Sequence, residues 1–151
     1  RLVGINLICC GFIERGFVRR IVDSFPDLRK LGLGKCWSVP NQCLDDIALL
    51  TNLTHLNLSH SSLSPEQFTS VSLQCKNIIS LNLDYVRGLP EESLIQFVAL
   101  RKNTLESLSV FGELLSDNIF QHIQCCLRLK LLHVSTCRKF TDKCFTSINE
   151  L

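Results

Sequence analysis

Cysteine and histidine are the residues in this chain with the most distinctive chemistry. Nine of the 151 residues are cysteine and four are histidine. Cys36 and Cys43 share a C-x6-C spacing with Cys137 and Cys144, which raises the question of a zinc site. However, the chain has no C-x2-C pair and no histidine at a zinc-finger offset. We therefore expect no metal and no other cofactor.

Motifs for nucleophilic catalysis or phosphate binding do not occur in the sequence. There is no G-x-S-x-G segment. The segment GLGKC, residues 32–36, departs from the G-x-x-x-x-G-K-S/T spacing of a phosphate-binding loop. Since no clustered acid and base can be identified, we expect the protein not to be an enzyme.

The stretch NLTHLNLSH, residues 52–60, permits two interpretations. Asn52 and Asn57 each begin an Asn-x-Ser/Thr triplet, which is typical of a glycosylated surface in a secreted protein. The same stretch contains Leu53, Leu56 and Leu58 in the pattern L-x-x-L-x-L, which indicates a buried strand in any compartment. The rest of the chain favours the second interpretation, because this pattern recurs.

Six copies of the pattern occur, and their first positions lie 24 to 27 residues apart. Such a period is typical of leucine-rich repeats, in which each unit supplies one short strand and one helix. We therefore predict an α/β right-handed solenoid (a horseshoe) over residues 1–151, with a parallel concave sheet and convex helices. The copies are Leu2-Ile5-Leu7, Leu28-Leu31-Leu33, Leu53-Leu56-Leu58, Ile78-Leu81-Leu83, Leu105-Leu108-Val110 and Leu129-Leu132-Val134.

Helix starts can be predicted between these strands. Ser64 is expected to be an N-cap, with Pro65 as the first helical residue and Gln67 completing a capping box. The other expectations are helices near 13–22 and 43–50, Pro90 as a first helical residue, and Ser116 and Thr141 as N-caps.

The repeat register assigns packing roles to the cysteines, with metal binding and disulfides as the alternatives. Cys10, Cys36 and Cys137 fall in the turn after a strand, where a small apolar side chain suits a buried turn. Cys75 and Cys126 fall at core positions, and Cys9 is expected to be exposed on the concave side. An exposed free thiol favours a reducing compartment, hence the cytoplasm or nucleus.

The concave face is the candidate binding surface, because strand side chains alternate and the residues between the leucines point away from the core. Exposed tyrosine and phenylalanine beside polar groups are typical anchors of protein interfaces. The alternative is an ordinary solvated sheet with scattered aromatic residues. The candidate partner-binding residues are Lys30, His55, Asn57, His60, Asn82, Asp84, Tyr85, Phe111 and His133.

Composition limits the class of partner. The net charge of +2 is too small to indicate nucleic acid or an anionic membrane, and no run of 18 uncharged apolar residues predicts a membrane span. Since the chain contains no methionine, we expect it to be a fragment or a processed piece of a longer protein.

The last unit carries a more specific resemblance. Residues 126–148, CLRLKLLHVSTCRKFTDKCFTSI, resemble the repeat of cysteine-containing leucine-rich-repeat proteins, with Cys144 in place of the usual glycine. The earlier unit from Cys75 departs further, having Val86 in the turn and Pro90-Glu91 where Thr-Asp is usual.

The resemblance implies the repeat region of an F-box protein, which recruits a protein substrate to an SCF-type ubiquitin ligase. A Skp-type adaptor and a cullin would then bind through an F-box, which this chain does not contain. Two alternatives stay open: an intracellular scaffold without a ligase role, and a secreted ectodomain.

Overall fold

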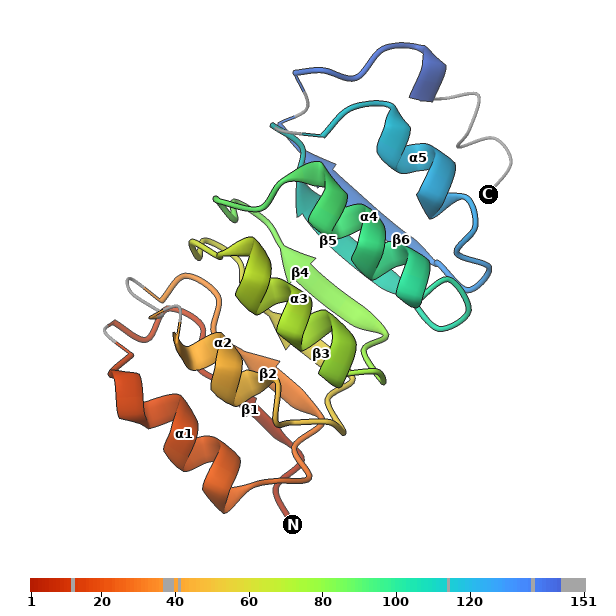
Figure 1. Cartoon of the computed structure of the whole chain (residues 1–151). Helices are drawn as coiled ribbons and strands as arrows, with labels where there is room; N and C mark the ends of the chain where they lie inside the picture. The colour runs from red at the N-terminus through yellow and green to blue at the C-terminus, as the bar shows by residue number, and fades with distance from the viewer. Residues whose placement is uncertain (12, 37–39, 41, 114, 137, 145–151) are drawn as a thin grey trace.

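The computed structural model shows an α/β fold built on one six-stranded parallel sheet (Figure 1). It describes residues 1–11, 13–36, 40, 42–113, 115–136 and 138–144. The strands lie side by side in chain order. They are β1 (Gly4–Asn6), β2 (Lys30–Gly32), β3 (His55–Asn57), β4 (Ser80–Leu83), β5 (Ser107–Phe111) and β6 (Leu131–Ser135).

Helices connect successive strands and lie together on one face of the sheet (Figure 1). Each described helix packs against the next one along the chain. They are α1 (Arg15–Ser24), α2 (Gln42–Ile47), α3 (Pro65–Gln74), α4 (Glu91–Leu100) and α5 (Asn118–Ile123). No helix in the described part of the chain has the length and apolar character needed to span a bilayer.

The sequence repeat and the sheet have the same register. The middle apolar position of each unit pairs with that of the next, beginning with Ile5 opposite Leu31. Since the pairing continues through all six strands, the apolar side chains of every unit point to the helices. The aligned column is Ile5, Leu31, Leu56, Leu81, Leu108 and Leu132.

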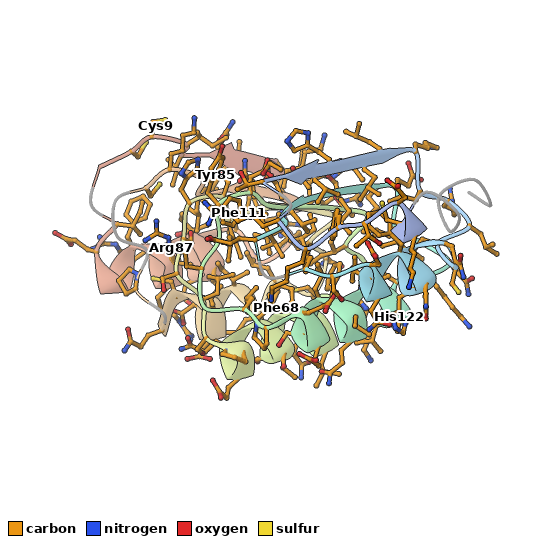
Figure 2. All side chains as sticks on the ribbon, turned by 90° about the horizontal axis from the view of Figure 1, so that it is seen from above. Cys9, Phe68, Tyr85, Arg87, Phe111 and His122 are labelled. Atoms are coloured by element: carbon orange, nitrogen blue, oxygen red, sulfur yellow. The ribbon has the colours of Figure 1, made fainter. Side chains whose placement is uncertain are left out.

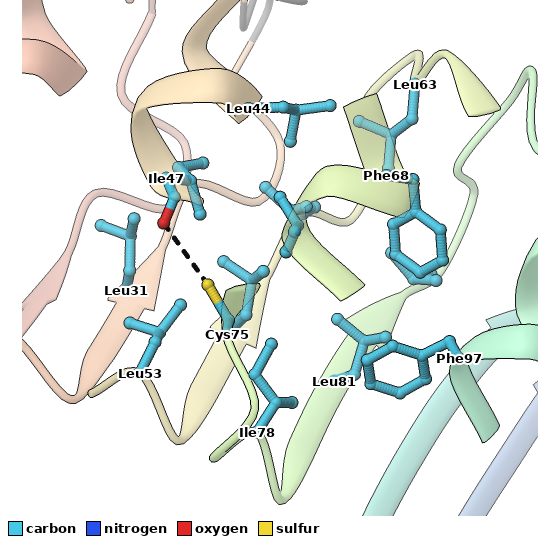
Figure 3. Close-up of a cluster of buried hydrophobic side chains, with 14 of the residues drawn as sticks. Leu31, Leu44, Ile47, Leu53, Leu63, Phe68, Cys75, Ile78, Leu81 and Phe97 are labelled. Atoms are coloured by element: carbon cyan, nitrogen blue, oxygen red, sulfur yellow. Dashed lines mark hydrogen bonds between the residues drawn. The ribbon is translucent and has the colours of Figure 1, made fainter. Parts of the chain in front are cut away.

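The core lies between the sheet and the helices (Figure 3). Leu31, Leu56 and Leu81 are at most 2% exposed, and Phe68 of α3 packs against Phe97 of α4 with 5.7 Å between ring centroids. The corresponding residues of the outer strands are only half buried, because β1 and β6 each have a single neighbouring strand.

The predictions for Cys9, Cys36, Cys75 and Cys126 are confirmed, and the one for Cys10 is wrong. Cys75 and Cys126 are buried, and the Cys75 thiol lies 3.5 Å from the carbonyl oxygen of Ile47 (Figure 3). Cys9 is exposed, as expected. Cys10 is also exposed instead of buried, because no preceding strand covers the turn after β1. Cys36 is buried in its turn, and Cys137 lies outside the described residues.

The helix at Ser64 begins as predicted. The hydroxyl of Ser64 accepts a hydrogen bond from the backbone N–H of Gln67 at 3.3 Å, and Pro65 is the first helical residue. The expected helices near 13–22 and 43–50 are present, with shifted ends, as α1 and α2.

Two other helix starts were predicted one residue out of place. Pro90 is the N-cap of α4 rather than its first helical residue, because its backbone is extended, with ψ of 157°. Asp117, not Ser116, is the N-cap of α5. The Ser116 hydroxyl nevertheless accepts from the backbone N–H of Asn118 at 3.3 Å, as a capping side chain does, and it donates to the Glu91 carboxylate at 2.9 Å. Most of the helix expected after Thr141 lies outside the described residues.

Candidate functional site

A groove of about 710 Å³ runs across the sheet on the face away from the helices. Its lining comes from all six strands, from Gly4 on β1 to His133 on β6. Since neighbouring strands are about 4.8 Å apart, the lining from Lys30 to His133 spans roughly 19 Å. The predicted residues that line this groove are Lys30, His55, Asn57, Asn82, Asp84 and His133.

Two asparagines in the groove also stabilise the ends of their strands. The side-chain oxygen of Asn57 accepts from the backbone N–H of Ser59 at 2.9 Å, and that of Asn82 accepts from Asp84 N–H at 2.9 Å. Asn6 makes the same contact with Ile8 at 3.2 Å. Because the oxygens are occupied, the side-chain NH₂ groups are the donors that these asparagines can offer to a partner.

His55 occupies the middle of the groove with a defined orientation. Its Nδ1 lies 2.9 Å from the hydroxyl of Thr54, and that hydroxyl donates to the carbonyl oxygen of Arg29 at 2.9 Å. Since a hydroxyl has one proton, the bond to Arg29 leaves Nδ1–H as the donor to Thr54 and Nε2 as an acceptor.

The neutral form of His55 is favoured. Burial, and then the nearby charge of Lys30, lower the pKa of His55, whereas Glu106 acts in the opposite direction. The imidazole is therefore uncharged at neutral pH, and Nε2 is available as a hydrogen-bond acceptor.

Asp84, directly after β4, places a carboxylate in the lining of the groove. Its Oδ2 accepts a short hydrogen bond of 2.6 Å from the hydroxyl of Ser109 on β5. Its Oδ1 is shielded from solvent and has no hydrogen-bond partner among the described residues. Ser109 thus positions Asp84, a role that the repeat register alone does not reveal.

Three aromatic rings form a second part of the surface, outside the groove lining. The ring of Tyr85 stacks on that of His60 with 4.6 Å between centroids, and it lies 5.0 Å from the ring of Phe111. Tyr85 is 48% exposed. Tyr85 and Phe111 lie together at the end of the sheet where Cys9 also lies (Figure 2). We call His60, Tyr85 and Phe111 the aromatic row.

The backbone beneath this row has an unusual and recurring conformation. His60 and Tyr85 have positive φ angles of 62° and 55°, although neither is glycine. This conformation costs an ordinary residue about 1 kcal/mol. The same position of three other units is left-handed, at Cys9, Lys35 and Thr136.

The nine predicted residues therefore form two neighbouring groups rather than one patch. Six line the groove, and three form the aromatic row along its edge. Five further groove-lining residues are not among the nine candidates, although the alternation of each strand places them on the same face. These are Asn6, Ser80, Ser107, Ser109 and Leu131.

The two Asn-x-Ser/Thr triplets differ in their surroundings. Asn52 is exposed, and its side-chain nitrogen donates to Asp27 at 3.3 Å. Asn57 lies on β3 and lines the groove, so a glycan there would occupy the candidate surface.

No cluster of three or more histidine, cysteine, aspartate or glutamate side chains is placed to hold a metal among the residues that the structure describes. No family model matches the chain.

Proposed function

We propose that the chain is a protein-recognition module of the leucine-rich-repeat type. The observation that carries this proposal is the groove across six parallel strands, with the aromatic row beside it, in which His60 and Tyr85 are exposed. The shared register of the sequence repeat and the sheet supports a right-handed solenoid with the groove on its concave side.

The chemistry of the surface suits a protein segment better than a small charged ligand. The groove offers amide donors, hydroxyls, the neutral His55 acceptor and one charged group of each sign, Lys30 and Asp84. The aromatic row adds apolar contact area that loses little side-chain entropy on binding, as interface anchors do. The module would act by binding, with no chemical step of its own.

Within this class we propose the substrate-recruiting region of an F-box subunit of an SCF-type ubiquitin ligase. The support is the resemblance of residues 126–148 to cysteine-containing leucine-rich repeats. The partner of the groove would be the protein to be ubiquitinated, in the cytoplasm or nucleus. The exposed thiols of Cys9, Cys10 and Cys125 suit a reducing compartment.

Site-specific photo-crosslinking tests the binding face. A benzoylphenylalanine at position 85 or 55 is expected to crosslink a protein partner in cells, and Tyr85→Ala is expected to weaken capture from position 55 by tenfold or more. The matched controls are positions 96 and 121, which are exposed on α4 and α5. Capture of the same partner from the control positions alone would overturn the proposed face.

Purification of the longest natural form of the protein tests the ligase role separately. Recovery of a Skp-type adaptor and a cullin, together with ubiquitination of the crosslinked partner, is expected. Partner binding without adaptor or cullin would favour a scaffold. A glycosidase-sensitive mass shift at Asn52 would favour an ectodomain instead.

A further inference from the structure

Cys10 and Cys36 occupy equivalent places in the first two units. Each lies three residues after the last apolar strand position of its unit, Leu7 or Leu33. The hydrogen bonds between β1 and β2 continue beyond both strands, because Cys9 N–H donates to the carbonyl oxygen of Gly34 at 3.0 Å. The turns therefore remain in register, and Cys10 comes opposite Cys36.

The spacing of adjacent parallel strands suits a disulfide. Neighbouring strands lie about 4.8 Å apart, and the Cα atoms of bonded cysteines are usually 4.4 to 6.8 Å apart. Two cysteines at equivalent positions of successive units therefore have a Cα–Cα distance that a disulfide allows. Among the described residues, Cys10 and Cys36 are the one such pair of cysteines on adjacent units.

The two residues also share a hydrogen-bond acceptor. The carbonyl oxygen of Leu7 accepts from the backbone N–H of Cys10 at 3.0 Å and from the thiol of Cys36 at 3.1 Å. The Cys36 sulfur therefore lies no further from the Cys10 backbone nitrogen than these two lengths combined. The two cysteines are therefore close neighbours across the paired turns.

The two thiols differ in access to solvent. Cys10 is exposed, whereas Cys36 is 3% exposed. Burial raises the pKa of Cys36, which lowers its thiolate fraction at neutral pH. Cys10 is therefore the thiol that meets a dissolved reagent first, and Cys36 is the thiol that reacts afterwards from inside the turn.

We propose that Cys10 and Cys36 are a reversible cross-linking site that forms a disulfide on reaction with a low-molecular-weight disulfide such as oxidised glutathione. The Cys10 thiolate attacks glutathione disulfide, forms a mixed disulfide and releases one glutathione thiolate. The Cys36 thiolate then attacks the Cys10 sulfur and releases the second glutathione. Two cysteine thiols are oxidised, one glutathione disulfide is reduced, and the two cysteine protons pass to the two glutathione thiols.

The cross-link would fix one end of the groove. It joins the turn after the edge strand β1 to the turn after β2, and Asn6 and Ile8 beside that turn line the groove. The inference is independent of the proposed function, because it concerns the thiols and not the partner.

Peptide mapping of the chain in glutathione redox buffers tests the proposal. After alkylation of free thiols and trypsin digestion, residues 2–15 joined to residues 36–76 are expected, with fragmentation placing the bond at Cys10 and Cys36. Cys10→Ser and Cys36→Ser are expected to abolish this product, whereas Cys9→Ser and Cys125→Ser retain it. Cys10→Ser is the decisive variant, because the side chain of Cys10 is exposed and its replacement is expected to leave the fold intact.

The kinetics provide a second readout. Because the Cys36 pKa is raised, the mixed disulfide at Cys10 is expected to accumulate at pH 7 and to convert several-fold faster at pH 8.5. The cross-linked protein should also melt at a higher temperature than the reduced form, with no such rise in Cys10→Ser. A Cys9–Cys10 disulfide, a Cys9–Cys36 disulfide, or stable glutathionylation without cross-linking would overturn the proposal.

Discussion

The guanidinium of Arg101 donates a hydrogen bond of 2.6 Å to the carbonyl oxygen of Ser72, on the preceding helix. The same Nη2 donates to the carbonyl oxygen of Cys75 at 2.8 Å, and the guanidinium carbon lies 5.3 Å from the ring centroid of Phe97. Arg101 is 3% exposed. Its charge thus satisfies carbonyl groups at the C-terminal end of α3, where a positive charge is also favoured by the helix dipole.

Replacement of Arg101 by Met should therefore destabilise the fold. The change leaves the carbonyl oxygen of Ser72 without this donor and leaves that of Cys75 only the longer bond of 3.4 Å from the N–H of Ile78. The free energy of unfolding is therefore expected to fall by about 2–4 kcal/mol. Arg101→Lys keeps a charge but not the planar fork, so a smaller loss is expected. Urea denaturation measures both, and a loss below about 0.5 kcal/mol for Arg101→Met would contradict this role.

Gly88 is expected to tolerate no side chain. Its φ is +88°, and an added Cβ would lie 2.5 Å from the backbone carbonyl oxygen of Leu63. Gly88→Ala should cost roughly 2 kcal/mol or more, from backbone strain and displacement of Leu63. Gly16→Ala is the control, because nothing lies within 4 Å of its added Cβ and alanine favours a helix. Equal melting temperatures for the two variants would refute this difference.

Two substitutions of Tyr85 distinguish its role in binding from its effect on stability. Tyr85→Ala loses the ring contacts with His60 and Phe111 but keeps the positive φ, whereas Tyr85→Gly loses the same contacts and relieves the strain. Tyr85→Gly should therefore be more stable than Tyr85→Ala by about 1 kcal/mol. Both variants should bind a partner equally poorly in a titration. Full binding by the glycine variant would exclude the ring as an anchor.

His55 should make stability depend on pH in the acidic range. Its folded pKa is lowered below the ordinary value of 6.5, so the unfolded chain binds this proton more readily. The contribution of neutral His55 to the free energy of unfolding is complete above about pH 6.5. It is lost as the pH falls through the pKa of His55 in the folded protein. His55→Gln should flatten that part of the profile measured by urea denaturation. An unchanged slope in His55→Gln would assign the effect to other groups.

The described cysteines should fall into two reactivity classes. Burial raises the pKa of Cys75 to about 11, and its thiol is closed off from reagents. Maleimide at pH 7.5 should label Cys9, Cys10 and Cys125 within minutes and leave Cys75 unlabelled until the protein unfolds. Mass mapping of labelled peptides checks this, and rapid labelling of Cys75 in the folded protein would show that its core position opens readily.

The groove was predictable because the register of a sheet follows from burial. Only one pairing register of the strands buries Leu31, Leu56 and Leu81 together. A shift of the register by one residue would turn these side chains to the solvent. The residues between them must then point the other way, so His55 and Asn57 could be placed on the groove face from the sequence. The buried positions of Cys75 and Cys126 follow from the same periodicity.

The pairing of polar and aromatic side chains was decided only by the tertiary structure. The bond from Ser116 to Glu91 and the bond from Ser109 to Asp84 each join residues 25 positions apart. The sequence pattern also placed Tyr85 with the groove residues, whereas a left-handed turn moves its ring to the edge, between His60 and Phe111. The repeating burial pattern rests on many equivalent apolar contacts, so the register of the sheet can be predicted even where single residues depart from the pattern. A hydrogen bond or a ring stack depends on the position of a few atoms, and only packing of neighbouring units brings those atoms together.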